Sequence, residues 1–301
     1  MSTFELPENL KTLYKHWDKH TVPPEPREKP IQSALLDEIL QFVTERMNIW
    51  SKKQAGKEPP FTDDPILQNY RFCNVYRELD RQTITIHESL KPFLGDFELW
   101  LLNLAFQRFV VKPETVKQVG FLKFDKEYNK SVYRRLLELD SPKYGSAYIF
   151  PISVIQKTKY NTREKFFTLY LPKVMREVAN IISGFENVTV NKALSQILPT
   201  FGFNFYFHWT EILIDVAYQH PAKIDLLQDF YIGPGAKPTL QRFGKGFQIE
   251  NLVRMQIDDI PLLTFNGKSV YLSAENWEGI FCEFRKYTNL KAGKGRKRCY
   301  R

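Results

Sequence analysis

Apolar residues recur at helical spacing along most of the chain, which predicts a mostly α fold. The clearest helix covers residues 33–53, and Ser33 is placed to cap its start. Further helices are predicted from about 87 to 111, over 127–139, over 163–184 with an interruption at Pro172, in two parts across 191–219, and over 276–289. Short runs with strand character occur at 83–86, 147–152 and 269–274. The expected fold is therefore mostly helical, with minor β pieces.

The expected domain organisation is simple. Residues 1–20 predict a short amphipathic helix, and the proline-rich stretch 20–30 predicts a connector. We expect residues 31–301 to form a single catalytic helical domain with a basic tail at its C-terminal end.

The stretch QNYRFCNVYRELDRQT at 68–83 is the densest polar run of the chain. We predict that it lies on a helix capped by Thr62 or Asp63, with Pro65 in the first turn. At about 100° per residue the polar side chains fall on one arc and the apolar ones on the opposite arc; the two sets are Arg71, Asn74, Arg77, Glu78 and Arg81, and Phe72, Val75, Tyr76 and Leu79. From these residues alone the polar arc is either a solvated helix face or an anion site, because guanidinium groups match phosphate oxygens.

Composition and charge narrow the class of protein. A net charge of +9 and a computed pI near 9.2 favour nucleic acid or another anionic partner. The 3 cysteines are widely spaced and form no CxxC pair, which predicts neither a disulfide framework nor a zinc site. The N-terminal residues lack an apolar signal-peptide core, and the apolar run 99–106 is too short to cross a bilayer. We expect a soluble, intracellular protein without a membrane partner.

Two further stretches suit a phosphate backbone. Gly233, Pro234 and Gly235 predict a tight turn whose N–H groups can face an oxyanion, as in helix-hairpin-helix modules. Basic side chains that follow the turn or lie in the tail are Lys237, Arg242, Lys245, Lys297 and Arg298. A plain surface turn and a solvated tail are the alternatives.

Several histidine and aspartate residues are considered as metal ligands or catalytic groups. The histidines are interpreted as structural, and the aspartates remain catalytic alternatives. His16 and His20 are one helical turn apart but lack an accompanying set of acidic or cysteine ligands, so we interpret them as surface residues and predict no metal site. His208 lies among aromatic residues and is predicted to be a core histidine. Asp258 and Asp259 lie at the distance beyond the glycine turn at which a helix-hairpin-helix glycosylase keeps its catalytic aspartate.

Three blocks together resemble one family: PPFTDDPILQNYRFCNVYRELDRQT at 59–83, FYIGPGAKPTLQRF at 230–243, and the C-terminal ENWEGIFCEFRKYTNLKAGKGRKRCY from 275. They look like the α-glutamyl/putrescinyl thymine pyrophosphorylases, or amino acid:DNA transferases, which are related to the helical domain of 5-hydroxymethyluracil DNA kinases. The resemblance implies a helical domain like that of the helix-hairpin-helix DNA glycosylases. The chain departs from the family before the glycine turn: the usual Gln is missing, and either Glu211 or Asp215 would supply the acid there.

The resemblance also implies a reaction. A kinase of the same pathway pyrophosphorylates 5-hydroxymethyluracil in double-stranded phage DNA, and the transferase replaces the pyrophosphate with a small-molecule amine. The implied catalytic residues are Arg71, Asn74, Arg77, Asp80 and Glu283, with Lys286, Arg81 and Tyr70 as substrate-binding residues. The arginines would hold pyrophosphate, a carboxylate would accept the amine proton, Asn74 would orient the base, and an aromatic ring, Tyr70 rather than Phe72 or Tyr76, would stack on the flipped base.

The sequence requires no cofactor, although Mg²⁺ is compatible with pyrophosphate chemistry. If the chain is phage-encoded, the host cytoplasm is the expected compartment. Two alternatives stay open: a base-excision glycosylase that uses Asp258 or Asp259, and a DNA-binding module without catalysis.

Overall fold

The computed structural model describes residues 4–29, 31–146, 150–255 and 260–295. The chain divides into two compact units. Unit 1 contains residues 1–80 and 226–301, and unit 2 contains the continuous segment 81–225. The predicted boundary near residue 30 coincides with neither break. Residues of the N-terminal segment instead pair within unit 1, as the parallel strands β1 (Phe4–Glu5) and β4 (Leu263–Phe265) show.

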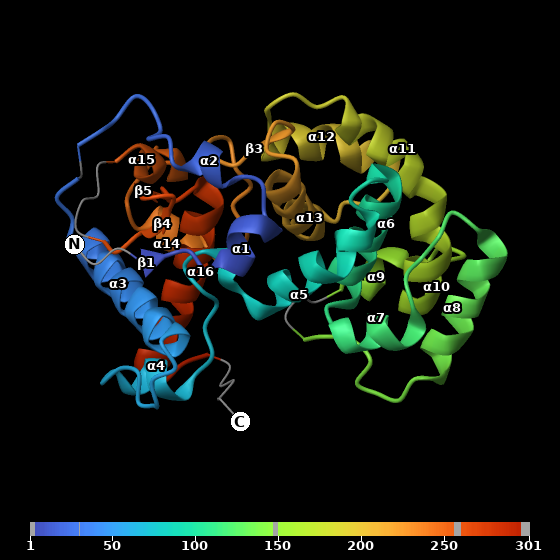
Figure 1. Ribbon diagram of the computed structural model, residues 1–301, viewed down its shortest axis with the longest axis horizontal. Coiled ribbons are helices and arrows are strands. Elements are labelled where there is room, and N and C mark those ends of the chain that lie inside the picture. The colour runs from blue at the N-terminus through green and yellow to red at the C-terminus, as the bar shows by residue number, and fades with distance from the viewer. Residues whose placement is uncertain (1–3, 30, 147–149, 256–259, 296–301) are drawn as a thin grey trace. The chain divides into compact units, whose positions relative to one another are not determined.

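Unit 1 is organised around its last helix, α16 (Ala274–Lys291). This helix packs against four other helices: α3 (Ala34–Gln54), α4 (Pro65–Asn69), α14 (Lys237–Gln241) and α15 (Ile249–Arg254). Figure 1 shows α3 and α16 side by side. The remaining elements are α1 (Glu8–Leu13), α2 (Trp17–His20), the 3-10 turn η1 (Arg77–Leu79) and β5 (Lys268–Ser269), which pairs antiparallel with β4.

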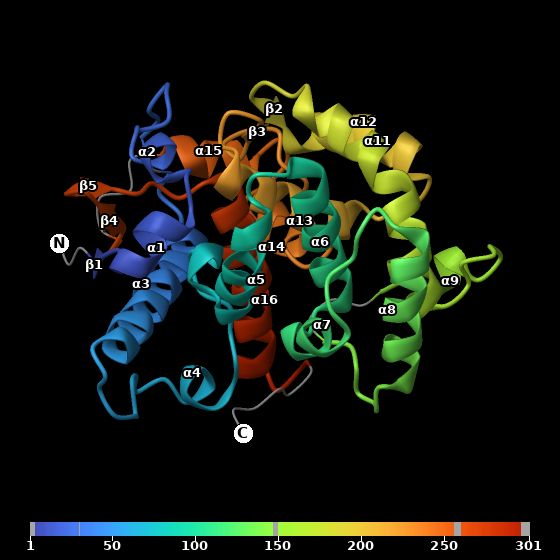
Figure 2. The ribbon, with the colours of Figure 1, turned by 45° about the vertical axis from the view of Figure 1, so that its right-hand side comes forward.

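Unit 2 is a helical assembly around α6 (Phe97–Val110), eleven of whose side chains are buried. Its neighbours are α5 (Arg81–Leu90), α7 (Pro113–Val119), α11 (Leu171–Ser183) and α13 (Tyr206–Gln219). Helices α11 and α12 (Val190–Phe201) run side by side in Figure 2. The other elements are η2 (Lys91–Phe93), α8 (Lys126–Glu138), α9 (Ile152–Ile155), α10 (Arg163–Lys165), the π-helical η3 (Phe166–Tyr170), and the parallel strands β2 (Val188–Thr189) and β3 (Ile224–Asp225).

The mostly α prediction is confirmed, and several helix ends agree closely. Ser33 caps α3, because its Oγ accepts a hydrogen bond from the Leu36 N–H. The interruption predicted at Pro172 appears as the π-helical turn η3 directly before α11. The break across 191–219 falls at Gly202, which ends α12 in the left-handed region.

Other predicted elements differ from the structure. Residues 83–86 lie in helix α5 and not in a strand, because burial of Thr83 and Ile86 follows helical spacing. The cap of α4 is Asp64, whose carboxylate accepts from the N–H groups of Ile66 and Leu67, rather than Thr62 or Asp63. Of the predicted strand 269–274, Ser269 alone lies in a strand, and residues 147–149 lie outside the described part of the chain.

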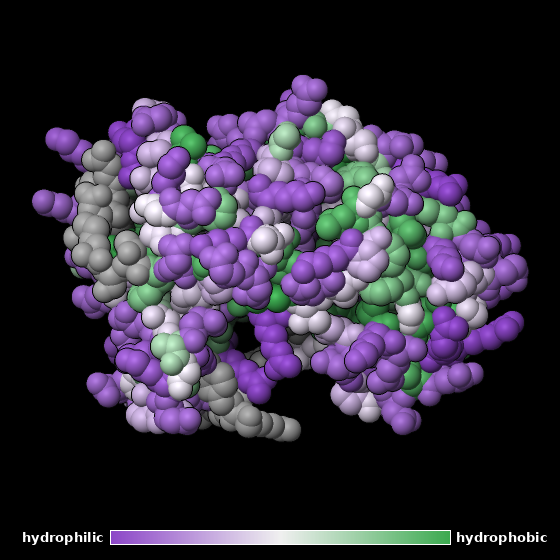
Figure 3. Space-filling view, in the orientation of Figure 1, coloured by the Kyte–Doolittle hydropathy of each residue, from purple (hydrophilic) through white to green (hydrophobic). Residues whose placement is uncertain are grey.

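Hydrophilic side chains cover much of the face seen in Figure 3, and hydrophobic ones gather over helices of unit 2. In the described part of the chain, none of the helices combines the length and the apolar character needed to cross a bilayer.

Candidate functional site

The three sequence blocks meet on α16 within unit 1. Tyr287 of α16 donates from its hydroxyl to Asp64 at the start of α4, at 2.6 Å. Glu283, on the same helix, accepts from the backbone N–H of Cys73 at 3.2 Å across 210 residues of sequence. Nearer the start of α16, Glu278 accepts from the N–H of Gly233 at 3.2 Å. The site is therefore assembled from segments that are distant in sequence.

The stretch 68–83 is not one helix, so the helical wheel drawn for it is wrong. Helix α4 ends at Asn69, residues 70–76 run without regular structure, and a single 3-10 turn spans Arg77–Leu79 before α5 starts. Long-range hydrogen bonds to this segment replace the helical ones. Burial still follows the predicted apolar set in part, since Val75, Tyr76 and Leu79 are buried, but Glu78 of the predicted solvated face is also buried.

Two cations hold the backbone of the loop 70–76 at three consecutive carbonyl groups. Arg46 of α3 donates to the carbonyl oxygens of Phe72 and Cys73 at 3.2 and 3.1 Å. Lys286 of α16 donates to the carbonyl oxygen of Arg71 and pairs with Glu283 at 3.3 Å. Both cations also lie over the Phe72 ring, Lys286 at 4.4 Å and Arg46 at 5.7 Å from its centroid. The loop is thus fixed by contacts to its main chain.

Asn74 and Asp80 close the loop onto η1. The Asp80 Oδ1 atom accepts from the Asn74 backbone N–H at 2.9 Å and from its side-chain amide at 3.0 Å, and that amide also donates to the Leu79 carbonyl. Burial raises the pKa of Asp80 to about 6, against the lowering effects of the Asn74 bond and of the Arg77 charge. A carboxylate in this range accepts a proton near neutral pH more readily than an ordinary aspartate.

The predicted aromatic stacking partners have different surroundings. Tyr76 is fully buried and donates to the Val270 carbonyl at 2.6 Å, which excludes it as a stacking surface in this structure. Phe72 packs against Phe42 and Tyr287. Tyr70 is partly exposed, as the prediction requires.

A cavity of about 470 Å³ opens beside α4, and its lining includes Thr62, Gln68 and Asn69.

The glycine turn packs against α16. A Cβ added to Gly233 would lie 2.8 Å from Glu278 Oε1, and one added to Gly235 would lie 2.5 Å from Cys282 Sγ. Arg285 of α16 donates to the Pro234 carbonyl at 3.0 Å. The sequence predicts that the N–H groups of this turn face a phosphate, but Glu278 occupies the N–H of Gly233. No helix precedes the turn in residues 226–232, so the helix-hairpin-helix likeness is not confirmed.

The predicted basic residues are distributed as follows. Arg71, within the loop, is exposed, and Arg77, directly after the loop, is partly buried. Arg81 is the exposed first residue of α5 in unit 2. Lys237, Arg242 and Lys245 are exposed in unit 1. Lys297, Arg298, Asp258 and Asp259 lie outside the described residues.

Sequence reasoning missed Arg46. The side chain is 4% exposed, and its Nε and Nη1 atoms have no hydrogen-bond partner among the described residues. The sequence signal that could have identified it is an arginine on the apolar stripe of a helix, between the buried Val43 and Met47.

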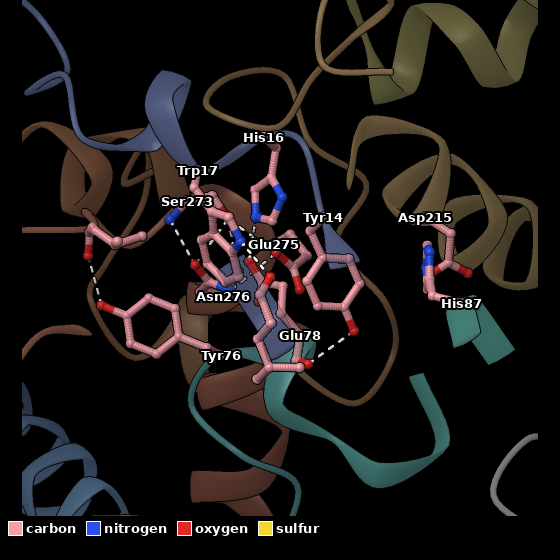
Figure 4. A network of polar contacts seen from close by, with 12 residues as sticks. Tyr14, His16, Trp17, Tyr76, Glu78, His87, Asp215, Ser273, Glu275 and Asn276 are labelled. Carbon is pink, nitrogen blue, oxygen red and sulfur yellow. Dashed lines mark hydrogen bonds and ion pairs between the residues drawn. The ribbon is translucent and has the colours of Figure 1, made fainter. Parts of the chain in front are cut away.

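The interpretation of His16 and His20 as surface residues is wrong. Their exposed fractions are 1% and 3%, and Glu78, which is 1% exposed, is their acidic neighbour from a distant segment of the chain. His16 Nε2 lies 2.7 Å from Glu78 Oε1. Figure 4 shows the Glu78 side chain pointing toward His16, beside Tyr14 and Trp17. The three side chains meet because the loop 70–76 returns the chain to the N-terminal segment.

In unit 2, Asp215 is a buried ion-pair partner. Arg108 donates to its two oxygens at 2.5 and 2.6 Å, and the His87 ring lies 3.1 Å away. Glu211 is also buried. His208 is the predicted core histidine: its ring stacks on Phe109 at 5.0 Å, and burial lowers its pKa to about 4.

Comparison with known proteins agrees with the sequence blocks. The family model described as the helical domain of 5-hmdU DNA kinase matches residues 33–297. The 5-hmdU DNA kinase of Bacillus phage SP10 is 26% identical over 331 aligned residues, which cover 94% of this chain and 50% of the relative. The chain therefore spans about half the length of this curated relative. No solved structure matches the chain significantly.

Proposed function

Because the chain belongs to the family of the 5-hmdU DNA kinase helical domain, as its motifs predict, we propose that it is an enzyme of thymine hypermodification in phage DNA. In this proposal it is a transferase that replaces the pyrophosphate of 5-pyrophosphoryloxymethyluracil with an amine. A kinase of the same pathway pyrophosphorylates the base in double-stranded DNA, and the amine is an amino acid or a polyamine.

The convergence of the three sequence blocks on α16 carries the proposal. It brings the loop with Arg71 and Asn74, and the turn with Arg77 and Asp80, against Glu283 and Lys286. The loop and the turn after it thus contribute two arginines, and the carboxylates of Asp80 and Glu283 bond to the loop. Together they are the donor and acceptor set that a displacement of pyrophosphate by an amine requires.

The reaction is a substitution at the methylene carbon attached to C5 of the base. The amine nitrogen forms a bond to this carbon while the carbon–oxygen bond to pyrophosphate breaks, and pyrophosphate leaves with the electron pair. Arg71 and Arg77 stabilise its developing charge as bidentate donors. Asp80 or Glu283 accepts the proton that the nitrogen loses.

Asn74 has a different role from the one that the resemblance implies. Both hydrogens of its amide group are engaged, one by the Leu79 carbonyl and one by Asp80. We therefore assign it as a positioning residue for the Asp80 carboxylate rather than as a contact to the base. Lys286 likewise positions the loop through the Arg71 carbonyl.

The test is incubation of the full chain with duplex DNA that carries the pyrophosphorylated base and a library of amines. Mass spectrometry of the nucleosides and a pyrophosphate assay measure the product. We expect Arg71→Ala and Arg77→Ala to abolish pyrophosphate release while DNA binding persists, and Arg242→Ala to retain the chemical step. Wild-type protein that is inert with every amine would contradict the proposal, and an arm with EDTA tests for Mg²⁺.

A further inference from the structure

His16, His20 and Glu78 form a buried group in unit 1 that the proposed reaction does not use. Each offers one ligand atom, and these atoms all lie within 4.8 Å of one another. The two histidines flank a single turn of helix, with His16 directly before α2 and His20 at its end, so both rings project from one side. Glu78 comes from η1, 58 residues after His20 in sequence.

The surroundings hold the three side chains in place. The Tyr14 hydroxyl donates to the Glu78 backbone carbonyl at 3.0 Å, and the Trp17 ring lies 4.4 Å from the His16 ring (Figure 4). The His16 and His20 rings lie 4.9 Å apart and nearly perpendicular, at 87°. Aromatic groups therefore form an apolar wall beside two imidazoles and a carboxylate.

Polar atoms of this group lack hydrogen-bond partners. Glu78 Oε1 contacts His16, but within the described ranges no group bonds to Glu78 Oε2 or to His20 Nδ1. Buried polar atoms of native proteins are nearly always paired, so two such atoms in one cluster point to a ligand.

We propose that His16, His20 and Glu78 bind one Zn²⁺ ion. Two imidazole nitrogens and one carboxylate oxygen are a known zinc ligand set, and they leave a fourth position open. Imidazole ligands favour zinc and related transition metals over Mg²⁺, so this ion differs from any Mg²⁺ that accompanies pyrophosphate. The 2.7 Å contact between His16 and Glu78 would open to about 3.3 Å, the separation of two ligand atoms around tetrahedral zinc.

The ion would join the N-terminal helix α2 to the turn that carries the candidate catalytic residues. Arg77 directly precedes Glu78, and Asp80 follows it by two residues. A ligand bond to Glu78 would therefore fix the turn from which both side chains project. The site has a positioning role in this view, and it contacts no substrate.

Metal binding to the full chain tests the proposal without DNA or amine, so its outcome is independent of the proposed reaction. Chelator-stripped protein is titrated with Zn²⁺ and, separately, with Co²⁺. We expect one Zn²⁺ per chain by elemental analysis, a melting temperature that rises with Zn²⁺, and a Co²⁺ spectrum of nitrogen and oxygen ligands. The absence of stoichiometric binding, or a thiolate charge-transfer band from Cys73 or Cys282, would overturn it.

Substitutions locate the ion. His20→Gln and Glu78→Gln each remove a ligand at nearly constant volume, and we expect the Zn²⁺ affinity to fall by more than about 100-fold, beyond the loss typical of outer-shell changes. His220→Gln, which removes an imidazole from unit 2, is the matched control and should bind like wild type. Unchanged affinity in both ligand variants would assign the ion elsewhere and refute the site. If a variant does not fold, the wild-type Co²⁺ spectrum and Zn²⁺-dependent melting decide the question.

Discussion

The two units obtain their structure in different ways. Unit 2 is built from helices whose buried rings pack together, as around Phe109, which contacts Phe166 at 5.8 Å and Phe205 at 5.8 Å between ring centroids. In unit 1 the candidate site lies on an irregular loop that side chains of α3 and α16 hold by its backbone. Periodic apolar patterns specify the first kind of structure, whereas the second depends on contacts between residues far apart in sequence.

The strongest way to break the packing of unit 2 is Asp215→Ala. It removes the carboxylate that accepts two bonds from the buried Arg108 and lies against His87. We expect the free energy of unfolding to fall by about 3–5 kcal/mol, because a buried charge loses its counterion. Urea denaturation followed by circular dichroism measures the loss.

Glu98→Ala is the control for this prediction. It removes the ion pair with Arg176 in the same unit, where both side chains are 40% or more exposed. The expected change is below about 1 kcal/mol. Equal losses in the two variants would show that burial of the Asp215 pair contributes nothing.

The pH dependence of stability probes the aromatic core around His208. Its pKa is about 4 in the folded protein and about 6.5 in the unfolded chain, so the unfolded state binds the proton more tightly. Stability contributed by neutral His208 is present above pH 6.5 and is lost as the pH falls toward 4, by about 3 kcal/mol. Denaturation of wild type and His208→Gln across this range checks the result. Parallel pH profiles would contradict it.

Arg46→Met tests whether contacts to the backbone hold the loop in unit 1. The substitution keeps an apolar stem on α3 but removes the donors to the Phe72 and Cys73 carbonyls. We expect a loss of about 2 kcal/mol and faster hydrogen exchange across residues 70–76, with helices of unit 2 unaffected. Arg134→Met, at an exposed position of α8, is the matched control. Unchanged exchange in the loop would show that Arg46 does not hold it.

The smallest expected effect is that of Gly235→Ala, which adds a methyl group where the glycine turn meets Cys282. We expect about 1 kcal/mol of destabilisation, since the Cys282 side chain must shift to make room. Gly244→Ala is the comparison variant in the same unit. The added carbon meets no heavy atom within 4 Å, so any loss there comes from backbone strain at its φ of +105° and not from a contact. Cys282→Ala should reduce the effect of Gly235→Ala if the contact with the sulfur causes it. A double-mutant cycle measured by thermal melting decides this.

The sequence predicted the helices of unit 2 better than it predicted the conformation of the site. Helices such as α6 and α13 carry long apolar patterns, and their packing follows from those patterns. The stretch 68–83 shows the limit. Its residues fit a helical wheel, but Arg46 and Lys286 bind carbonyl groups of the loop, and no local pattern reveals these partners.

The motifs name residues for the candidate site without stating their conformation. Asp80, Glu283 and Lys286 of this set contact one loop, and their roles stay predictions. The group of His16, His20 and Glu78 was missed, since its acidic member lies in a different segment of the chain from the two histidines. Long-range contacts of this kind are set by the fold and leave no periodic signal in the sequence.

The sequence of unit 2 is inserted between the two segments of unit 1, and this order matters while the chain is being translated. Residues 81–225 are continuous, so they can fold on the ribosome as soon as they emerge, whereas residues 1–80 lack their partners until 226–301 are made. During this interval the apolar side of α3, which later packs on α16, has no helix to cover it. The candidate site of unit 1 forms only when α16 packs on the first segment, so a chain cut before α16 would have a folded inserted unit and no candidate site.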